Sequence, residues 1–333
     1  MKNKNFFYFS LATISFINGF SSDETFSLDS SQKNLAPSVS VFGSYLYWLA
    51  SEEQMSAYAN IQTVETLAEG KRNIFEEKNA SFPWSSGFRL GTGYLSEDHL
   101  LDFKLYWSWF YTKSHNVIPK GNQVIDPEFF TAFATLDFVY DAQVDWRLKY
   151  NVIDLEMGRN FDFDKIFSLK PFIGLKAASI KQNIESFFTG FLLIPANSWE
   201  NVTNNFNGIG VSGGAESAFY LAGRGLQQFN LNSRLSLAGL YGKYTTDDFY
   251  YDSLGRSVPS IVDRIYQGEL MFQGLLGFNW LISPEDKKSL FSIGASYEIQ
   301  WWLNILRFAT YQQCKLRGDL TFQGLTLDVK WNF

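Results

Sequence analysis

The chain ends with Leu325-Thr326-Leu327-Asp328-Val329-Lys330-Trp331-Asn332-Phe333, a stretch in which apolar and polar side chains alternate without a break. Successive side chains of a β-strand point to opposite faces, so this stretch predicts a strand with one apolar face and one polar face. Soluble domains seldom finish on an apolar strand that closes with a tryptophan and a phenylalanine. The pattern therefore predicts a terminal strand whose apolar face meets lipid or a protein core.

The same alternation recurs in nine further segments. The clearest internal one, residues 100–112, places six large side chains on one face, namely Leu101, Phe103, Leu105, Trp107, Trp109 and Tyr111. Such a row needs lipid or a protein core around it. The ten predicted strands cover residues 39–49, 87–95, 100–112, 142–157, 168–179, 208–221, 228–244, 265–282, 289–301 and 325–333.

The connections between these segments alternate strictly between short and long. The short ones are residues 96–99, 162–167, 222–225 and 283–288, and the long ones are 50–86, 113–141, 180–207, 245–264 and 302–320. Outer-membrane barrels have short periplasmic turns, long external loops and an even number of strands. We therefore predict an all-β fold over residues 39–333, a transmembrane antiparallel up-and-down β-barrel of about ten strands. The first and last strands must pair, because open edges would leave amides unsatisfied in hydrocarbon.

Three places depart from this simple pattern. Within residues 142–157 the apolar positions shift by one residue, which predicts a β-bulge near Val152. Asp126-Pro127-Glu128 precedes apolar residues at helical spacing and indicates a short loop helix, with an extra strand pair, making twelve strands, as the alternative. Ser51 and Gln54 match a capping box for a second short helix.

The beginning of the chain reads as an export signal. Lys2 and Lys4 precede an uncharged apolar stretch, residues 6–20, that is shorter than the roughly 20 residues of a spanning helix. We predict a signal peptide over residues 1–21 and a flexible, acidic and serine-rich lead-in over 22–38. The expected location is the outer membrane of a Gram-negative bacterium.

The composition fits this interpretation and excludes others. Mean hydropathy is -0.13, yet the chain holds 33 Phe, 17 Tyr and 10 Trp, as alternating lipid-facing strands with aromatic girdles require. A net charge of -6 argues against a nucleic-acid partner, which calls for a basic face. The single cysteine, Cys314, excludes an intramolecular disulfide and is expected to be a free loop thiol.

Charge decides which face of each strand meets lipid. A lysine or arginine on the lipid side at mid-bilayer costs roughly 2 to 4 kcal/mol, so the charged faces are expected to line the lumen and to set ion selectivity. These lumen candidates are Arg89, Asp102, Lys104, Asp145, Arg147, Lys149, Asp154, Glu156, Lys176, Glu216, Arg234, Glu269, Glu298, Asp328 and Lys330. With Lys170 they comprise eight basic and eight acidic residues, which predicts weak ion selectivity. The aromatic residues expected at the membrane interfaces are Trp107, Trp109, Trp146, Trp280, Trp301, Trp331 and Phe333.

The sequence offers little for catalysis. Its two histidines are His99, in a short turn, and His115, at the base of a loop. Ser114 and Asn116 adjoin His115, but neighbours on an extended chain point apart. We therefore predict no enzymatic activity, no cofactor and no metal site.

Several short motifs resemble one family in their order along the chain. They are Phe42-Gly43, Tyr47-Trp48, Tyr58-Ala59, Gly87-Phe88-Arg89-Leu90-Gly91, Tyr150 to Arg159, Leu169 to Leu175, Phe206 to Gly210 and Leu240-Tyr241-Gly242. The chain thereby resembles the pore-forming, major-outer-membrane-protein-like family of Legionella and environmental Chlamydiae. The chlamydial porins proper are rich in cysteine, so a single cysteine argues against a disulfide-crosslinked role.

The resemblance implies a porin that lets small hydrophilic solutes and ions diffuse passively. Because barrels of about eight strands are packed shut, a closed barrel acting as an envelope-structural or adhesin protein through long external loops is the alternative. The expected partners are outer-membrane lipid, small hydrophilic solutes and the barrel-assembly machinery, which would engage the strand ending at Phe333. A homo-oligomer is kept as an alternative to a monomer, and no nucleic-acid partner is expected.

Overall fold

The computed structural model describes residues 38–333 with ten gaps, at residues 53–56, 68–69, 97–100, 120–123, 128–138, 164–165, 191–196, 225, 284–288 and 310–314. The predicted signal peptide and all but the last residue of the lead-in therefore lie outside the described residues. The same holds for Gln54, His99 and Cys314. No helix of the described part is long and apolar enough to cross a membrane.

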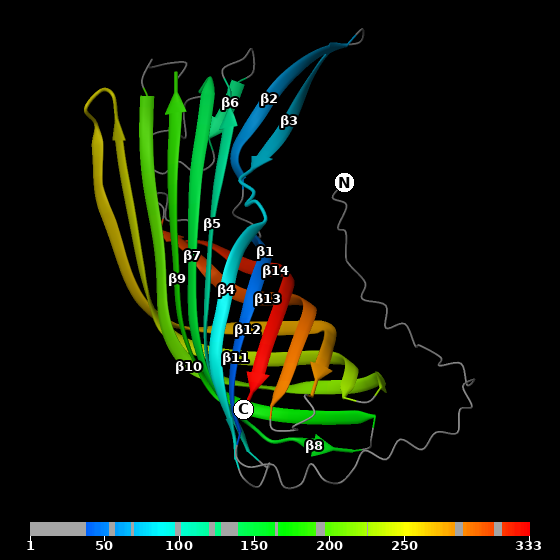
Figure 1. The fold of residues 1–333 in the computed structure, drawn as a ribbon. Helices are drawn as coiled ribbons and strands as arrows, with labels where there is room; N and C mark the ends of the chain where they lie inside the picture. Colours follow the sequence, from blue (N-terminus) through cyan, green and yellow to red (C-terminus); the bar gives the residue numbers. More distant parts are fainter. Residues whose placement is uncertain are drawn as a thin grey trace. The chain divides into compact units, whose positions relative to one another are not determined.

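Ten antiparallel strands form a closed barrel (Figure 1). They are β1 (Ser38–Glu52), β4 (Ser85–Leu95), β5 (Asp102–Ile118), β7 (Asp141–Gly158), β9 (Phe167–Thr189), β10 (Asn197–Arg224), β11 (Gln227–Asp252), β12 (Ser257–Ile282), β13 (Leu290–Ala309) and β14 (Lys315–Asn332). Each pairs with the next, and β14 pairs with β1 from Ser40 opposite Asn332 to Glu52 opposite Leu320. The predicted ten-stranded barrel is confirmed, and the twelve-stranded alternative is wrong.

Four short strands lie outside the barrel order. Strands β2 (Ala57–Leu67), β3 (Gly70–Asn79) and β6 (Val124–Pro127) form a separate antiparallel sheet in the order β3-β2-β6. Strand β8 (Phe161–Asp162) pairs with the start of β9. Asp126 and Pro127 end strand β6, so no helix starts at these two residues. The apolar residues predicted to form the helix, after residue 127, lie outside the described residues. Ser51 lies within β1 and is not a helix N-cap.

The barrel strands extend well beyond the predicted segments at the end opposite the short turns. Residues 180–207 and 245–264, expected to be long loops, are mostly strand, and β11 joins β12 through residues 253–256 alone. The expected alternation is weak there because the outer faces of these extensions carry mostly polar side chains. A ladder of backbone hydrogen bonds does not require an apolar outer face, so the strands continue.

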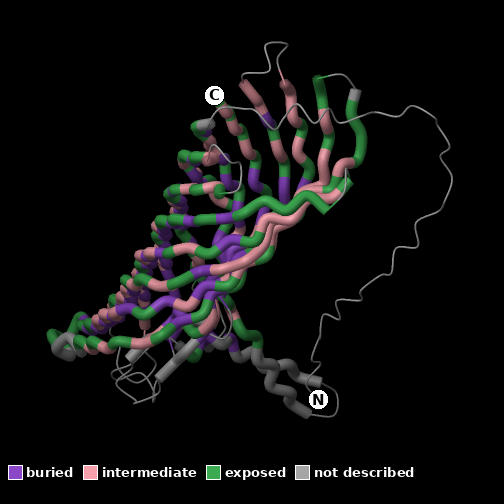
Figure 2. Tube along the Cα trace, turned by 90° about the horizontal axis from the view of Figure 1, so that it is seen from below, coloured by how far each residue is buried: buried purple, intermediate pink, exposed green. Residues whose placement is uncertain are grey.

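An apolar belt surrounds the barrel near the short turns. Its outward side chains include Val41, Leu105, Ile173, Leu235 and Leu327, which are 41 to 69% exposed, and exposed and buried residues alternate along each strand (Figure 2). This band of exposed apolar side chains is the surface that lipid covers. Six of the seven aromatic residues expected at the interfaces lie on this outer face, namely Trp107, Trp109, Trp280, Trp301, Trp331 and Phe333.

Strand β7 explains the remaining aromatic residue and the predicted bulge. Its pairing with β5 runs without a register shift from Gly158 to Ala142, so the bulge predicted near Val152 is wrong. Inward and outward positions keep alternating along the whole strand. What changes along β7 is the chemistry of the two faces. From Gly158 back to Asp141, the outer face changes from apolar to charged, and the inner face changes from acidic to apolar. The strand therefore leaves the membrane near Val152.

Because the two faces of β7 exchange their chemistry, three predicted lumen residues and one predicted interface residue lie on the opposite face from the one expected. Asp145, Arg147 and Lys149 lie on the outer face of β7, and Trp146 is fully buried inside the barrel. These four predictions are wrong, because they assumed that polar positions face the lumen along the whole strand. Outside the membrane the rule reverses, since water surrounds the wall and the interior can be apolar.

Candidate functional site: the barrel lumen

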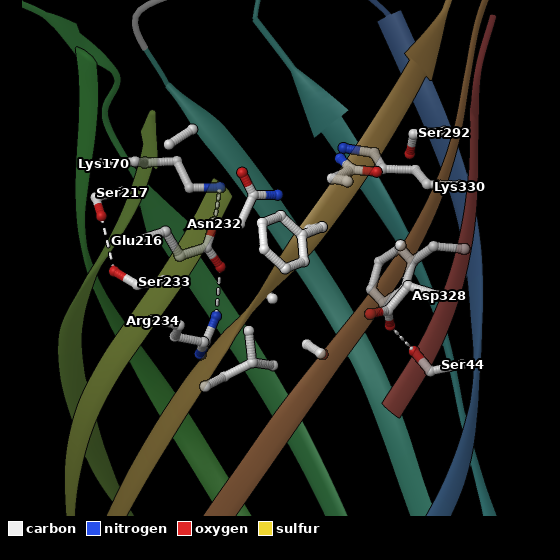
Figure 3. Close-up of a pocket in the computed structure, with 18 of the residues that line it drawn as sticks. Ser44, Lys170, Glu216, Ser217, Asn232, Ser233, Arg234, Ser292, Asp328 and Lys330 are labelled. Atoms are coloured by element: carbon white, nitrogen blue, oxygen red, sulfur yellow. Dashed lines mark hydrogen bonds and ion pairs between the residues drawn. The ribbon is translucent and has the colours of Figure 1, made fainter. Parts of the chain in front are cut away.

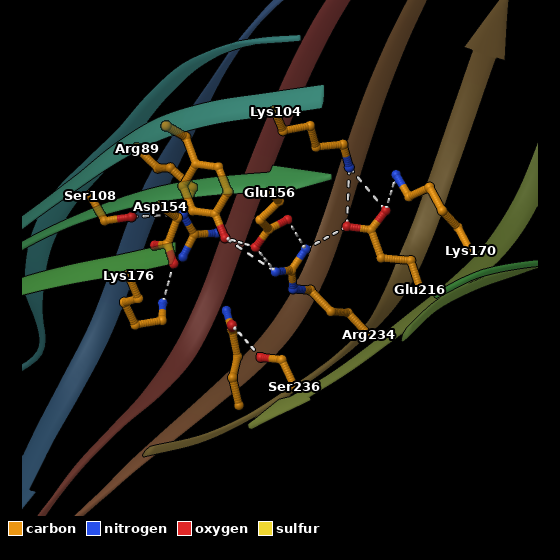
Figure 4. A network of polar contacts seen from close by, with 12 residues as sticks. Arg89, Lys104, Ser108, Asp154, Glu156, Lys170, Lys176, Glu216, Arg234 and Ser236 are labelled. Atoms are coloured by element: carbon orange, nitrogen blue, oxygen red, sulfur yellow. Dashed lines mark hydrogen bonds and ion pairs between the residues drawn. The ribbon is translucent and has the colours of Figure 1, made fainter. Parts of the chain in front are cut away.

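Charged side chains connect non-adjacent strands inside the barrel at the level of the apolar belt (Figure 4). Arg89 of β4 reaches Glu298 of β13 with two hydrogen bonds of 2.9 and 3.2 Å, although β1 and β14 lie between those strands. Its Nε also donates to Ser108 at 2.9 Å. The side chain of Glu298 is completely buried, so this pair is shielded from solvent.

A second group of charges centres on Glu216 of β10. Its carboxylate accepts hydrogen bonds from Lys104 at 2.9 Å and from Arg234 at 2.5 Å, and it forms an ion pair with Lys170 at 2.5 Å. Arg234 also binds Glu156 of β7, across the two strands that separate them. The cations and anions in this part of the lumen therefore neutralise one another.

Smaller contacts complete the polar layer. Lys176 and Asp154, on adjacent strands, form an ion pair of 2.5 Å with almost no solvent exposure. Asp328 accepts a hydrogen bond from Ser44 at 2.5 Å. Each of these groups is held by a partner, as burial of a charge requires.

A cavity of about 330 Å³ adjoins this charged layer and extends toward the short-turn end of the barrel, which we assign to the periplasmic side (Figure 3). Lys330 and Ser292, both close to strand ends, line it together with Asp328. Its lining contains five basic and two acidic residues, so it presents more positive than negative groups.

An apolar plug fills the lumen beyond the charged layer. We define the lumen plug as Trp48, Phe110, Tyr150, Trp302 and Phe322, each at most 1% exposed. The ring centroids of Trp48 lie 5.8 Å from Phe110 and 5.9 Å from Phe322, and those of Tyr150 and Phe322 lie 4.7 Å apart. A water-filled passage would expose its lining, so water does not reach these five rings.

The structure brings together twelve of the fifteen predicted lumen residues. The twelve that face inward are Arg89, Asp102, Lys104, Asp154, Glu156, Lys176, Glu216, Arg234, Glu269, Glu298, Asp328 and Lys330. The lumen plug was not foreseen as a group. The sequence contains a signal for it in the first strand. Phe42, Leu46 and Trp48 are apolar, and so are residues on the other face of the same strand, such as Tyr45 and Tyr47. Lipid covers the face that carries Val41, Tyr45 and Tyr47, so apolar residues on the other face indicate burial inside the barrel.

One histidine–carboxylate pair forms, but on the outer wall. His115 Nδ1 lies 3.0 Å from Asp145 Oδ1, and Lys113 lies 2.9 Å from the same oxygen. Partial burial raises the pKa of Asp145, but hydrogen bonds from Lys113, His115 and Gln143 outweigh it and hold this pKa below its usual value. Ser114 is buried on the opposite face, away from the pair. The described residues contain no group of three or more His, Cys, Asp or Glu side chains placed to hold a metal ion.

Comparison with known families agrees with this architecture. The profile of the family described as Legionella pneumophila major outer membrane protein precursor matches residues 34–333. The chain belongs to this family. Family membership and the closed barrel together identify an outer-membrane barrel protein, and the resemblance read from the short motifs is confirmed.

Individual proteins are much more distant. No curated protein matches the chain. The outer membrane protease OmpT of Escherichia coli is 7% identical, with 89% of this chain and 96% of that chain covered and a TM-score of 0.41. The toluene transporter TodX of P. putida is 7% identical, with 89% of each chain covered and a TM-score of 0.19.

Proposed function

We propose that the protein is a closed, non-catalytic outer-membrane barrel with an envelope-structural or adhesive role. Its membrane-embedded part anchors the protein, and its extended strand ends and external connections lie outside the membrane. The lumen plug carries this proposal, because Trp48, Trp302 and Phe322 are each at most 1% exposed. The ion pairs inside the lumen support it as well, since they tie non-adjacent strands together and leave few unpaired charges for a solute. A major envelope protein with a sealed lumen strengthens the membrane without making it permeable.

Passive diffusion of small hydrophilic solutes is the second candidate. The periplasmic cavity of about 330 Å³ favours it, because a polar vestibule already occupies part of the lumen. Diffusion requires a conformation in which the plug side chains move aside. Six basic and seven acidic residues of the predicted set, counting Lys170, face the lumen, so such a pore is expected to show weak ion selectivity.

Planar-bilayer recordings separate the two candidates. The wild-type protein is compared with the double variant Trp48→Ala/Phe322→Ala, which removes two adjacent plug rings. Trp301→Ala is the matched control, because Trp301 lies on the lipid-facing side of the strand that carries Trp302. Heat-modifiable migration on a denaturing gel verifies that each variant is folded.

We expect no steady conductance from the wild type or from the control, and discrete steps from the double variant. Steady wild-type conductance would overturn the closed-barrel proposal in favour of diffusion. A folded double variant without conductance would show that the plug is not what closes the lumen.

A further inference from the structure

Three aromatic side chains stand side by side on the outer wall, far beyond the apolar belt. Phe187 of β9, Trp199 of β10 and Tyr251 of β11 occupy paired positions on adjacent strands. Trp199 lies 5.1 Å from Phe187 and 4.9 Å from Tyr251 between ring centroids, and the rings of Trp199 and Tyr251 are nearly parallel at 8°. Phe249 lies 5.8 Å from Tyr251 and is 40% exposed. We call these four residues the aromatic row.

The aromatic row is too far from the bilayer to be part of its interfacial girdle. On β11 the apolar belt ends at Tyr241, and Tyr251 follows ten residues later on the same face. Ten strand residues span about 33 Å, or about 23 to 27 Å along the membrane normal for strands tilted by 35 to 45°. The headgroup layer extends only about 5 to 8 Å beyond the hydrocarbon. These rings therefore need another explanation than lipid contact.

A row of polar side chains runs beside the aromatic row. Asp145, Glu185 and Asn201 occupy paired positions on β7, β9 and β10, one step closer to the membrane. Ion pairs orient both carboxylates, since Lys113 binds Asp145 and Arg147 binds Glu185, each at 2.9 Å. An ionised carboxylate has about four acceptor sites, so each retains capacity for a further hydroxyl donor. Both rows line one hollow of about 430 Å³.

This combination matches the chemistry of sugars better than that of proteins or anions. Aromatic faces pack against the apolar C–H faces of pyranose rings, while neighbouring carboxylates and amides accept and donate hydrogen bonds to hydroxyls. The two carboxylates are paired with Lys113 and Arg147, so the polar row has no net charge and fits a neutral partner better than a phosphate-rich one. A standard protein interface buries about 800 Å² on each side, more than four rings framed by charges offer.

We propose that the aromatic row and its polar neighbours bind neutral saccharide chains, and that the occupant is the polysaccharide of neighbouring lipopolysaccharide in the outer leaflet. The wall faces sideways, along the plane of the membrane, so its nearest neighbours are the lipids beside the barrel. At about 25 Å above the hydrocarbon, it is the saccharide part of those lipids that it meets. The site does not depend on whether the lumen conducts.

The test uses the folded full-length protein in detergent and polysaccharide freed from its lipid by mild acid. Isothermal titration compares the wild type with Trp199→Ala/Tyr251→Ala. The matched control is Tyr241→Ala/Tyr266→Ala, which removes a stacked pair of the apolar belt with centroids 6.2 Å apart. Dextran of equal length serves as the unrelated neutral saccharide. Saturation-transfer NMR on the wild type alone provides a measurement that needs no variant.

We expect measurable binding by the wild type, a loss of at least about tenfold in the aromatic-row variant and no change in the control, because each stacked ring contributes to affinity. Saturation is expected to pass from aromatic protons to the sugar. The site would be overturned if the wild type showed no binding with the polysaccharide at millimolar concentration and in about 10-fold molar excess over the protein. An unchanged affinity in the aromatic-row variant would overturn it as well. Equal binding of dextran would overturn the assignment to the cell's own lipopolysaccharide.

Discussion

The ion pair between Arg89 and Glu298 provides a direct measure of how strongly the lumen is held together. Replacing Arg89 with methionine keeps most of the side-chain volume but removes the guanidinium. The carboxylate of Glu298 then keeps only neutral donors, from Gln273, Gln300 and Thr326. Because the Glu298 side chain is fully buried, Arg89→Met leaves an uncompensated charge in the barrel interior.

The magnitude follows from the burial of the pair. Removing one partner of a buried ion pair costs about 3 to 5 kcal/mol, whereas replacing both partners is often neutral. We therefore expect Arg89→Met to lower the free energy of unfolding by about 3 to 5 kcal/mol, and Arg89→Met/Glu298→Gln to recover most of that loss. Arg147→Met is the matched control, because its pair with Glu185 is 37% and 41% exposed and is worth at most about 1 kcal/mol.

The assay is equilibrium unfolding in urea with the barrel inserted in lipid vesicles. Tryptophan fluorescence reports the transition, and heat-modifiable gel migration reports the folded fraction independently. A loss below about 1 kcal/mol in Arg89→Met would refute the claim that the pair is buried and structural. A double variant as unstable as the single one would show that the guanidinium acts through packing, and not through the charge of Glu298.

Two further predictions concern the strands. Asp252 is buried at a hairpin tip, which raises its pKa, but hydrogen bonds from the backbone and side chain of Arg256 outweigh this and hold the pKa below its usual value. Its stabilisation is therefore present above about pH 4 and is lost as pH falls through the lowered pKa. Asp252→Asn is expected to speed hydrogen exchange of the Leu254 and Arg256 amides at pH 7, after correction for intrinsic rates, and to have less effect at a pH below the lowered pKa. Gly210→Ala is expected to prevent or severely impair folding, because a Cβ there would lie 1.9 Å from the Gly239 carbonyl oxygen. Gly239→Ala is the control and is expected to fold normally, because its Cβ meets only a Leu270 methyl at 3.8 Å. Heat-modifiable migration on gels measures the folded fraction of both variants.

The membrane part of the fold could be predicted because lipid imposes a simple rule on it. Every second residue of a spanning strand must be apolar, so strands such as β5 and β14 show their period directly in the sequence. The even strand number, the closure between β1 and β14 and the positions of the short turns follow from the same constraint. These features can be read from the sequence because lipid restricts the residue type at each outward position and leaves no strand edge unpaired.

Strand β7 shows where that rule ends. Residues 142–158 alternate throughout, yet the sequence reports only which positions are apolar and not what surrounds them. A one-residue shift of the pattern has two explanations, a bulge in the backbone or a change of surroundings, and local sequence cannot choose between them. Pairing with two neighbouring strands decides the matter, because the uninterrupted register excludes the bulge.

The amino-acid sequence by itself determined an outer-membrane β-barrel, its spanning strands and most of the charges that face its lumen. Only the tertiary structure decided that these charges pair between non-adjacent strands, that aromatic rings from β1, β5, β7, β13 and β14 pack together inside the barrel and that a second aromatic cluster lies on the outer wall. The physical reason is distance along the chain. Arg89 and Glu298, or Trp48 and Phe322, meet because the closure of a ten-stranded barrel sets its width, and no local pattern encodes that width.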